Sequence, residues 1–189
     1  MAAAAELLDR SGPDGLALSA LARHLGVRTP SLYHHVDGLD GLRSALRRHG
    51  VERLGDAMQR ASSGRAGRDA LAAVAAAYVG FGRAHPGLYA LTLAGDTSAD
   101  PELAIAAERL LTTVAAVLRG YGVEGDDALH ATRYLRSTLH GFVALEAAGG
   151  FALDLDLNVS LDRLVAALDA GIERLARDTV DPSGGSGRA

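Results

Sequence analysis

The chain has 189 residues, of which 48% are apolar and 22% charged, enough for one or two globular domains with a sizeable core. It contains no Cys, which excludes disulfides, Cys-based zinc sites and thiol catalysis. A secretory pattern and an apolar run of about 18 residues are both absent, so we expect a cytoplasmic protein without a membrane span.

The net charge of −4 is distributed unevenly along the chain. Residues 1–60 contain 8 Arg against 7 acidic residues, whereas residues 61–189 contain 11 Arg against 16 acidic residues. A basic first part joined to an acidic body is the direction expected when only the first part meets phosphate.

The pattern of apolar residues predicts an all-α protein, because Ala, Leu, Arg and Glu dominate and alternating strand patterns are missing. We expect an N-terminal domain over residues 1–61, a helical domain over 62–180 and a disordered Pro-, Ser- and Gly-rich tail over 181–189. The helices expected in chain order cover residues 2–10, 18–25, 29–35, 39–61, 68–84, 87–94, 101–120, 126–148 and 158–178, with a loop over 95–100.

Residues 18–36 predict a helix-turn-helix, two short helices around the turn residue Gly26. Thr29 is expected to cap the second helix and Pro30 to open it. We expect a small core of Leu21, Leu25, Val27, Leu32 and Val36. The opposite face of the second helix would carry Arg28, Thr29, Ser31, Tyr33, His34 and His35, a polar and partly aromatic surface of the kind that contacts bases and phosphates.

The string Leu-Ala-x-x-Leu-Gly-Val-x-x-Pro-Ser-Leu-Tyr-x-His-Val resembles the DNA-binding domain of the TetR family of bacterial regulators. The resemblance implies that Thr29, Ser31, Tyr33 and His35 contact the operator, Tyr33 and His35 mainly at phosphates. Arg28 would reach a phosphate or a base. The DNA-binding residues implied or expected on this surface are Ser19, Arg28, Thr29, Ser31, Tyr33, His34, His35 and Arg43.

Four positions depart from the pattern of that family. Ala17 replaces a capping Thr or Ser, Ser19 a common Arg and His34 a usual aromatic, and Leu39 replaces a phosphate-binding Lys between Asp37 and Asp40. The absence of one Lys–phosphate contact lowers the slope of log affinity against log salt concentration by about 0.9. A ligand-binding dimer of the same fold with weak or lost DNA binding is therefore the alternative function.

The second half of the chain resembles the TetR C-terminal domains named for a Trp-His-Gly motif, through Leu139-His140-Gly141 and His85-Pro86-Gly87-Leu88-Tyr89. The last two expected helices carry apolar stripes that would form a four-helix bundle across a two-fold axis. The alternative is an ordinary intrachain core. The dimerisation residues expected there are Leu139, Phe142, Val143, Leu161, Leu164, Val165, Leu168 and Ile172.

A small-molecule site is expected among the middle helices, where apolar walls and a few hydroxyls occur together. Its candidate residues are Tyr78, Phe81, Tyr89, Leu93, Leu111, Val114, Tyr134 and Ser137, although each aromatic side chain is individually more typical of a core. The resemblance implies a homodimeric repressor on a palindromic double-stranded operator, released when a small-molecule effector moves the helix over residues 39–61.

Other classes of protein fit the sequence less well. No Gly-rich phosphate loop and no recognisable nucleophile arrangement occur, which argues against an enzyme. His24, His34, His35 and His49 lack the spacing of metal ligands, which argues against a metal sensor. We therefore expect neither a cofactor nor a metal.

Overall fold

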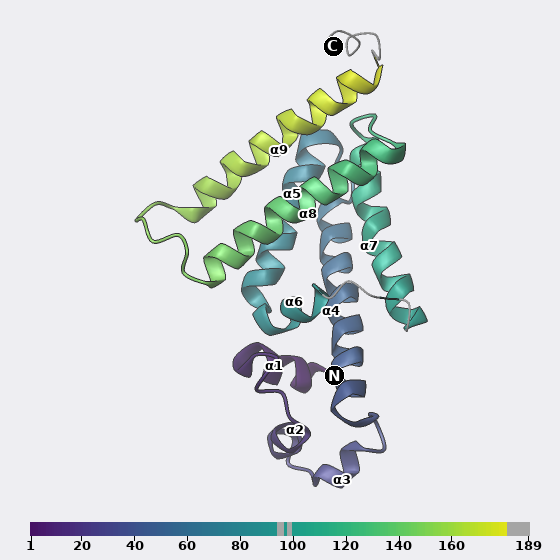
Figure 1. The fold of residues 1–189 in the computed structure, drawn as a ribbon, viewed down its shortest axis with the longest axis vertical. Coiled ribbons are helices and arrows are strands. Elements are labelled where there is room, and N and C mark those ends of the chain that lie inside the picture. Colours follow the sequence, from purple (N-terminus) through teal and green to yellow (C-terminus); the bar gives the residue numbers. More distant parts are fainter. Residues whose placement is uncertain (94–96, 98–99, 181–189) are drawn as a thin grey trace, which may run out of the picture. The chain divides into compact units, whose positions relative to one another are not determined.

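The computed structural model describes residues 1–93, 97 and 100–180, and over that part of the chain all regular structure is helical (Figure 1). The all-α prediction is therefore confirmed. The helices are α1 (Ala2–Ser11), α2 (Leu18–Leu25), α3 (Thr29–Leu32), α4 (Gly38–Ser62), α5 (Gly67–Ala84), α6 (Pro86–Thr92), α7 (Pro101–Arg119), α8 (Gly125–Ala147) and α9 (Leu157–Val180). None of the helices described is long and apolar enough to cross a bilayer.

Local chemistry sets several of these boundaries. Helix α2 ends at Gly26, whose φ of 68° is left-handed and whose N–H donates to the carbonyls of Ala22 and Arg23. Helix α7 begins after Asp100, whose Oδ1 accepts the N–H of Leu103 at 3.0 Å. Both ends satisfy backbone groups that a helix terminus leaves without a partner.

The second helix of the helix-turn-helix differs from the prediction. Helix α3 ends at Leu32 instead of His35, although the N–H groups of His35 and Val36 still donate to the Leu32 carbonyl. Arg28, rather than Thr29, is the N-cap, and Arg28 makes no side-chain capping bond. The predicted end of α6 at Ala94, most of the predicted loop over 95–100 and the predicted tail over 181–189 lie outside the described residues.

Two compact units divide the chain. The first unit contains Met1–Asp56 and Gly80–Leu110, and the second contains Ala57–Val79 and Leu111–Ala189. Helices α4, α5 and α7 have residues in both units. The predicted domain boundary after residue 61 stays a prediction, since the first unit also includes α6 and the beginning of α7.

In the first unit, α1 packs against α2 and α6, and α2 packs against α3. The core includes the fully buried side chains of Leu8, Leu46 and Leu88. On α4, Val51 forms a cluster with Leu103 and Ala106 of α7. Gly50 of α4 lies so close to α6 that a Cβ there would be 3.1 Å from Cγ of Leu88.

In the second unit, α8 packs against α9. Apolar side chains from every helix of the unit are buried, among them Leu71 of α5, Leu118 of α7 and Leu168 of α9. Gly171 of α9 faces the ring of Tyr134 on α8, and a Cβ there would be 3.5 Å from Cε1. At this distance a Cβ would be in ordinary van der Waals contact with the ring, so α8 and α9 pack against each other at this point.

Candidate nucleic-acid interface

Helices α2 and α3, which follow one another through the turn at Gly26 (Figure 1), each have a buried side and an exposed side. Leu18, Leu21 and Ala22 bury one side of α2, and Leu32 is the buried residue of α3. Leu25 and Val27, which were expected in this core, are instead 47% and 45% exposed. They follow the last buried turn of α2 on either side of Gly26, where the backbone changes direction.

The predicted DNA-contacting side chains lie on the exposed side of the motif. Tyr33 is 60% exposed, and Thr29 is half-buried at the start of α3. We call this exposed side of the motif the reading surface. Its other exposed members are Ser19, Arg28, Ser31, His34 and His35. The surface therefore offers a guanidinium, hydroxyls and imidazoles, which are groups that bind phosphates and base edges.

Acidic residues accompany the basic ones beside this surface. Nη1 of Arg43 lies 3.8 Å from Oδ1 of Asp40, one turn earlier on α4. Asp40 is almost fully exposed, so this ion pair is weak and would compete only slightly with a phosphate. At the start of α2, Ala17 makes no side-chain capping bond, so its N-terminal N–H groups depend on other partners.

Most residues predicted for dimerisation are buried within this chain. Leu139, Phe142, Val143, Leu161, Val165, Leu168 and Ile172 are each less than 9% exposed, and Leu164 is half-buried. Their burial fits the intrachain alternative, and their role in a dimer stays a prediction. Little of their surface is exposed in this chain.

Different side chains of α8 and α9 are exposed. Ser137, Ala144, Ala167 and Ala170 are small and exposed, and a Cβ on Gly141 would have open space around it. We call Ser137, Gly141 and Ala144 of α8 together with Ala167 and Ala170 of α9 the small-residue face of these two helices. The flanking exposed residues include Arg133, Arg163 and Asp162.

The predicted ligand-binding residues are divided between the two units. Phe81, Tyr89 and Leu93 belong to the first unit, and the second contains Tyr78, Leu111, Val114, Tyr134 and Ser137. Tyr78, Phe81, Tyr89 and Val114 are buried, whereas Leu111, Tyr134 and Ser137 are exposed. Their role in binding a ligand stays a prediction.

The comparisons with known proteins agree with this geometry. The family model for bacterial regulatory proteins of the tetR family matches residues 1–46, and a tetracyclin repressor-like C-terminal domain matches residues 71–168. The HTH-type transcriptional regulator Rv0681 of Mycobacterium tuberculosis is 40% identical over 171 residues, which cover 88% of this chain and 77% of the relative.

Solved structures share the fold. A Rhodococcus sp. RHA1 protein of unknown function has a TM-score of 0.74 and 28% identity, covering 92% of this chain and 91% of its own. TetR-Q116A of Acinetobacter baumannii AYE, solved with minocycline, has a TM-score of 0.62 and 23% identity, covering 96% and 94%. The helix-turn-helix, the helical second half and these matches together identify the chain as a member of the TetR family of bacterial transcriptional regulators.

Proposed function

We propose that this regulator is a repressor that binds a palindromic operator through α3 and is released from it by a small molecule. The observation that carries the proposal is the two-sided character of the motif: Leu32 anchors α3 in the core, while Arg28, Ser31 and Tyr33 project from it into solvent. A helix fixed on one side and polar on the other can enter a major groove without rearranging.

Two copies of the chain would act together on a palindrome. The small-residue face of α8 and α9 supports a dimer in which two helices of each protomer pack across a two-fold axis. Such symmetry sets two recognition helices about 34–36 Å apart, one turn of DNA. We propose this face as the dimer contact, in place of the buried stripe.

The dimer contact can be tested with one substitution in open space. Gly141→Arg places a long charged side chain on the small-residue face, and nothing within 4 Å of the new Cβ obstructs folding. Sedimentation should show a dimer for the natural chain and a monomer for the variant. Gly80→Arg on α5 is the matched control, because it is also helical with nothing within 4 Å, and it should stay dimeric.

The effector is proposed to be a small, largely apolar molecule with a few polar groups. One structural neighbour was solved in complex with minocycline, which is a property of that protein and supports the class of ligand here. Within the second unit, the predicted set includes both apolar side chains and a hydroxyl, as in Leu111, Val114 and Tyr78, and this mixture fits such a molecule. We propose that the protein acts in the cytoplasm and has no catalytic role.

A ligand-binding dimer with weak DNA binding is the second candidate. Asp37 and Asp40 favour it, because their carboxylates flank Leu39, which stands in place of a phosphate-binding Lys, and lower the positive potential that the motif offers to phosphates. Selection of bound fragments from the source genome, followed by footprinting, decides between the two candidates. A protected palindrome supports the repressor, and a failure to enrich any sequence supports the ligand-binding dimer.

A further inference from the structure

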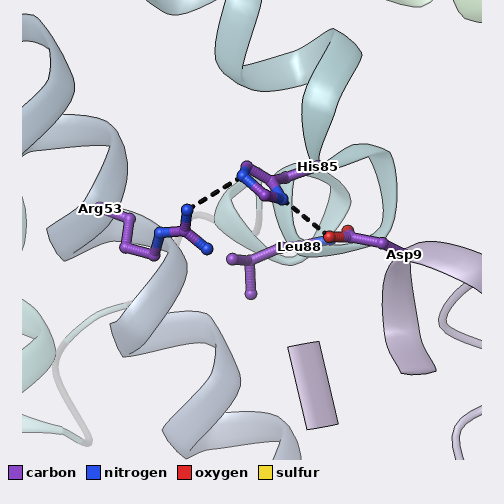
Figure 2. Close-up of polar contacts among 4 residues, drawn as sticks. All are labelled: Asp9, Arg53, His85 and Leu88. Atoms are coloured by element: carbon purple, nitrogen blue, oxygen red, sulfur yellow. Dashed lines mark hydrogen bonds and ion pairs between the residues drawn. The ribbon is translucent and has the colours of Figure 1, made fainter. Parts of the chain in front are cut away.

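The first turn of α6 is held by a side chain from α1 (Figure 2). Oδ1 of Asp9 accepts the N–H of Leu88 at 2.9 Å, and Oδ2 of Asp9 lies 2.9 Å from Nδ1 of His85. His85 is the N-cap of α6 and makes no capping bond of its own. Asp9 therefore supplies from another helix the carboxylate that a helix N-terminus favours.

The backbones of α1 and α6 are also in contact at this point. Gly87 has no side chain, and a Cβ there would overlap the carbonyl of Leu8 and lie 2.9 Å from the N of Asp9. The carboxylate of Asp9 is mostly buried, with 16% of the side chain exposed. The two helices are thus joined by a close backbone approach and by both oxygens of one carboxylate.

Helix α4 joins the same group through Arg53. Nη2 of Arg53 lies 3.0 Å from Nε2 of His85, on the opposite side of the ring from Asp9 (Figure 2). A guanidinium can only donate, so Nε2 must be the accepting nitrogen and the ring proton must be on Nδ1. One proton arrangement then satisfies both contacts: Arg53 donates to His85, and His85 donates to Asp9.

We propose that Asp9, His85 and Arg53 form a relay that couples the position of α6 to the DNA-reading helices. The proposal rests on the function proposed above. Helix α1 packs against α2, and α2 against α3, so a displacement of α6 that keeps these hydrogen bonds also displaces the reading surface. The three side chains are positioning residues, since none of them lies on that surface.

Asp9→Asn separates the relay from simple helix capping. The Asn oxygen can still accept the N–H of Leu88, but the Asn NH₂ group can only donate toward His85. If His85 shifts its proton to Nε2 to accept from Asn, that proton then faces the donor of Arg53. The variant therefore keeps the cap and gives up at least one of the two hydrogen bonds of His85.

The relay predicts a spectroscopic signature that does not depend on DNA. In the natural chain, ¹⁵N spectra of the histidine ring should place the proton of neutral His85 on Nδ1. In Asp9→Asn this tautomer should lose its predominance. A His85 ring protonated on Nε2 in the natural chain would overturn the relay.

Hydrogen exchange with and without operator tests the coupling itself. The probe is a genomic fragment that the natural chain binds, and the readout is amide exchange in α6. Allosteric couplings are usually 5–150-fold, so operator should slow this exchange about fivefold or more in the natural chain. Asp9→Asn and Arg53→Leu should still bind the fragment but show a much smaller change, and Arg53→Lys, which keeps a donor, should restore it.

Asp14→Asn is the matched control, because it removes the same charge from an exposed position of the same unit. It should respond as the natural chain does. If Asp9→Asn does not fold, Arg53→Leu tests the relay from its exposed end. The relay alone is overturned if operator slows exchange in α6 equally in the variants and the natural chain. It is also overturned if the natural chain binds the fragment and exchange in α6 does not change. A natural chain that binds no fragment overturns the proposed function and the relay together.

Discussion

The hydroxyl of Tyr121 donates a 2.6 Å hydrogen bond to Oδ1 of Asp169, a carboxylate on α9 that is only 8% exposed. Nε of Arg68 on α5 lies 3.9 Å from the other oxygen of the same carboxylate. Tyr121 follows α7, so this one buried charge connects three parts of the second unit. Such a charge is tolerated because it keeps its partners.

Tyr121→Phe should therefore destabilise the protein. It removes the shortest bond to Asp169 and leaves a buried oxygen without that donor, which costs about 1–3 kcal/mol. Urea unfolding at neutral pH measures the destabilisation, and Tyr134→Phe, at an exposed tyrosine of α8, is the control. A stability equal to that of the natural chain would contradict this account of Asp169.

The Tyr121–Asp169 pair also predicts how the stability of the protein changes at alkaline pH. Burial and the hydrogen bond to Asp169 raise the pKa of Tyr121 above its ordinary value of 10.0. The unfolded chain then loses this proton at a lower pH than the folded chain, so the free energy of unfolding should fall as the pH rises above 10.0. The fall should be smaller in Tyr121→Phe.

His49 predicts how the stability of the protein changes with pH in the acidic range. Burial and the neighbouring Arg53 lower the pKa of His49 below 6.5, so the folded state favours the neutral ring. As the pH falls below 6.5, the unfolded chain takes up the proton first and the free energy of unfolding decreases. His49→Gln should flatten this slope, while His130→Gln, at an exposed position of α8, should leave it unchanged. Equal slopes in all three proteins would refute the assignment.

Gly87→Ala should separate α1 from α6. The added methyl would overlap the Leu8 carbonyl, and overpacking of this kind typically costs about 1–3 kcal/mol. Gly80→Ala is the matched control, because its Cβ meets nothing within 4 Å and Ala favours the helix by up to about 1 kcal/mol. The two unfolding curves should move in opposite directions, and a neutral Gly87→Ala would show that the helices are not in close contact.

The helices could be predicted from the sequence because their ends are chemically marked. Gly26 ends α2 and Pro101 opens α7 where the local pattern indicates. The inside of the second unit is harder to assign, since an apolar stripe such as Leu161, Val165 and Leu168 looks the same whether it faces its own chain or a partner. Periodicity gives the face of a helix but not what covers it.

The role of Asp9 could not be predicted, for a related reason. Its partners, His85 and Leu88, are distant in the sequence, and only the fold brings them together. One local signal exists: an acidic residue in the last turn of a helix is unfavourable for the helix dipole and needs a compensating partner. The His85-Pro86 pair at the start of α6 is visible in the sequence, but from the sequence alone it indicates only a resemblance to TetR C-terminal domains and not a contact with Asp9.

The most direct test of the central claim is operator affinity measured across salt concentrations for the natural chain, Tyr33→Ala and Arg28→Ala. Both side chains are exposed on the reading surface, so the variants should fold normally. We expect each variant to bind about tenfold or more weakly, which corresponds to about 1.4 kcal/mol of binding free energy. Arg28→Ala should also lower the salt slope by about 0.9 for each phosphate that the arginine neutralises. Affinity and slope that are unchanged in both variants would contradict the assignment of α3 as the helix that reads DNA.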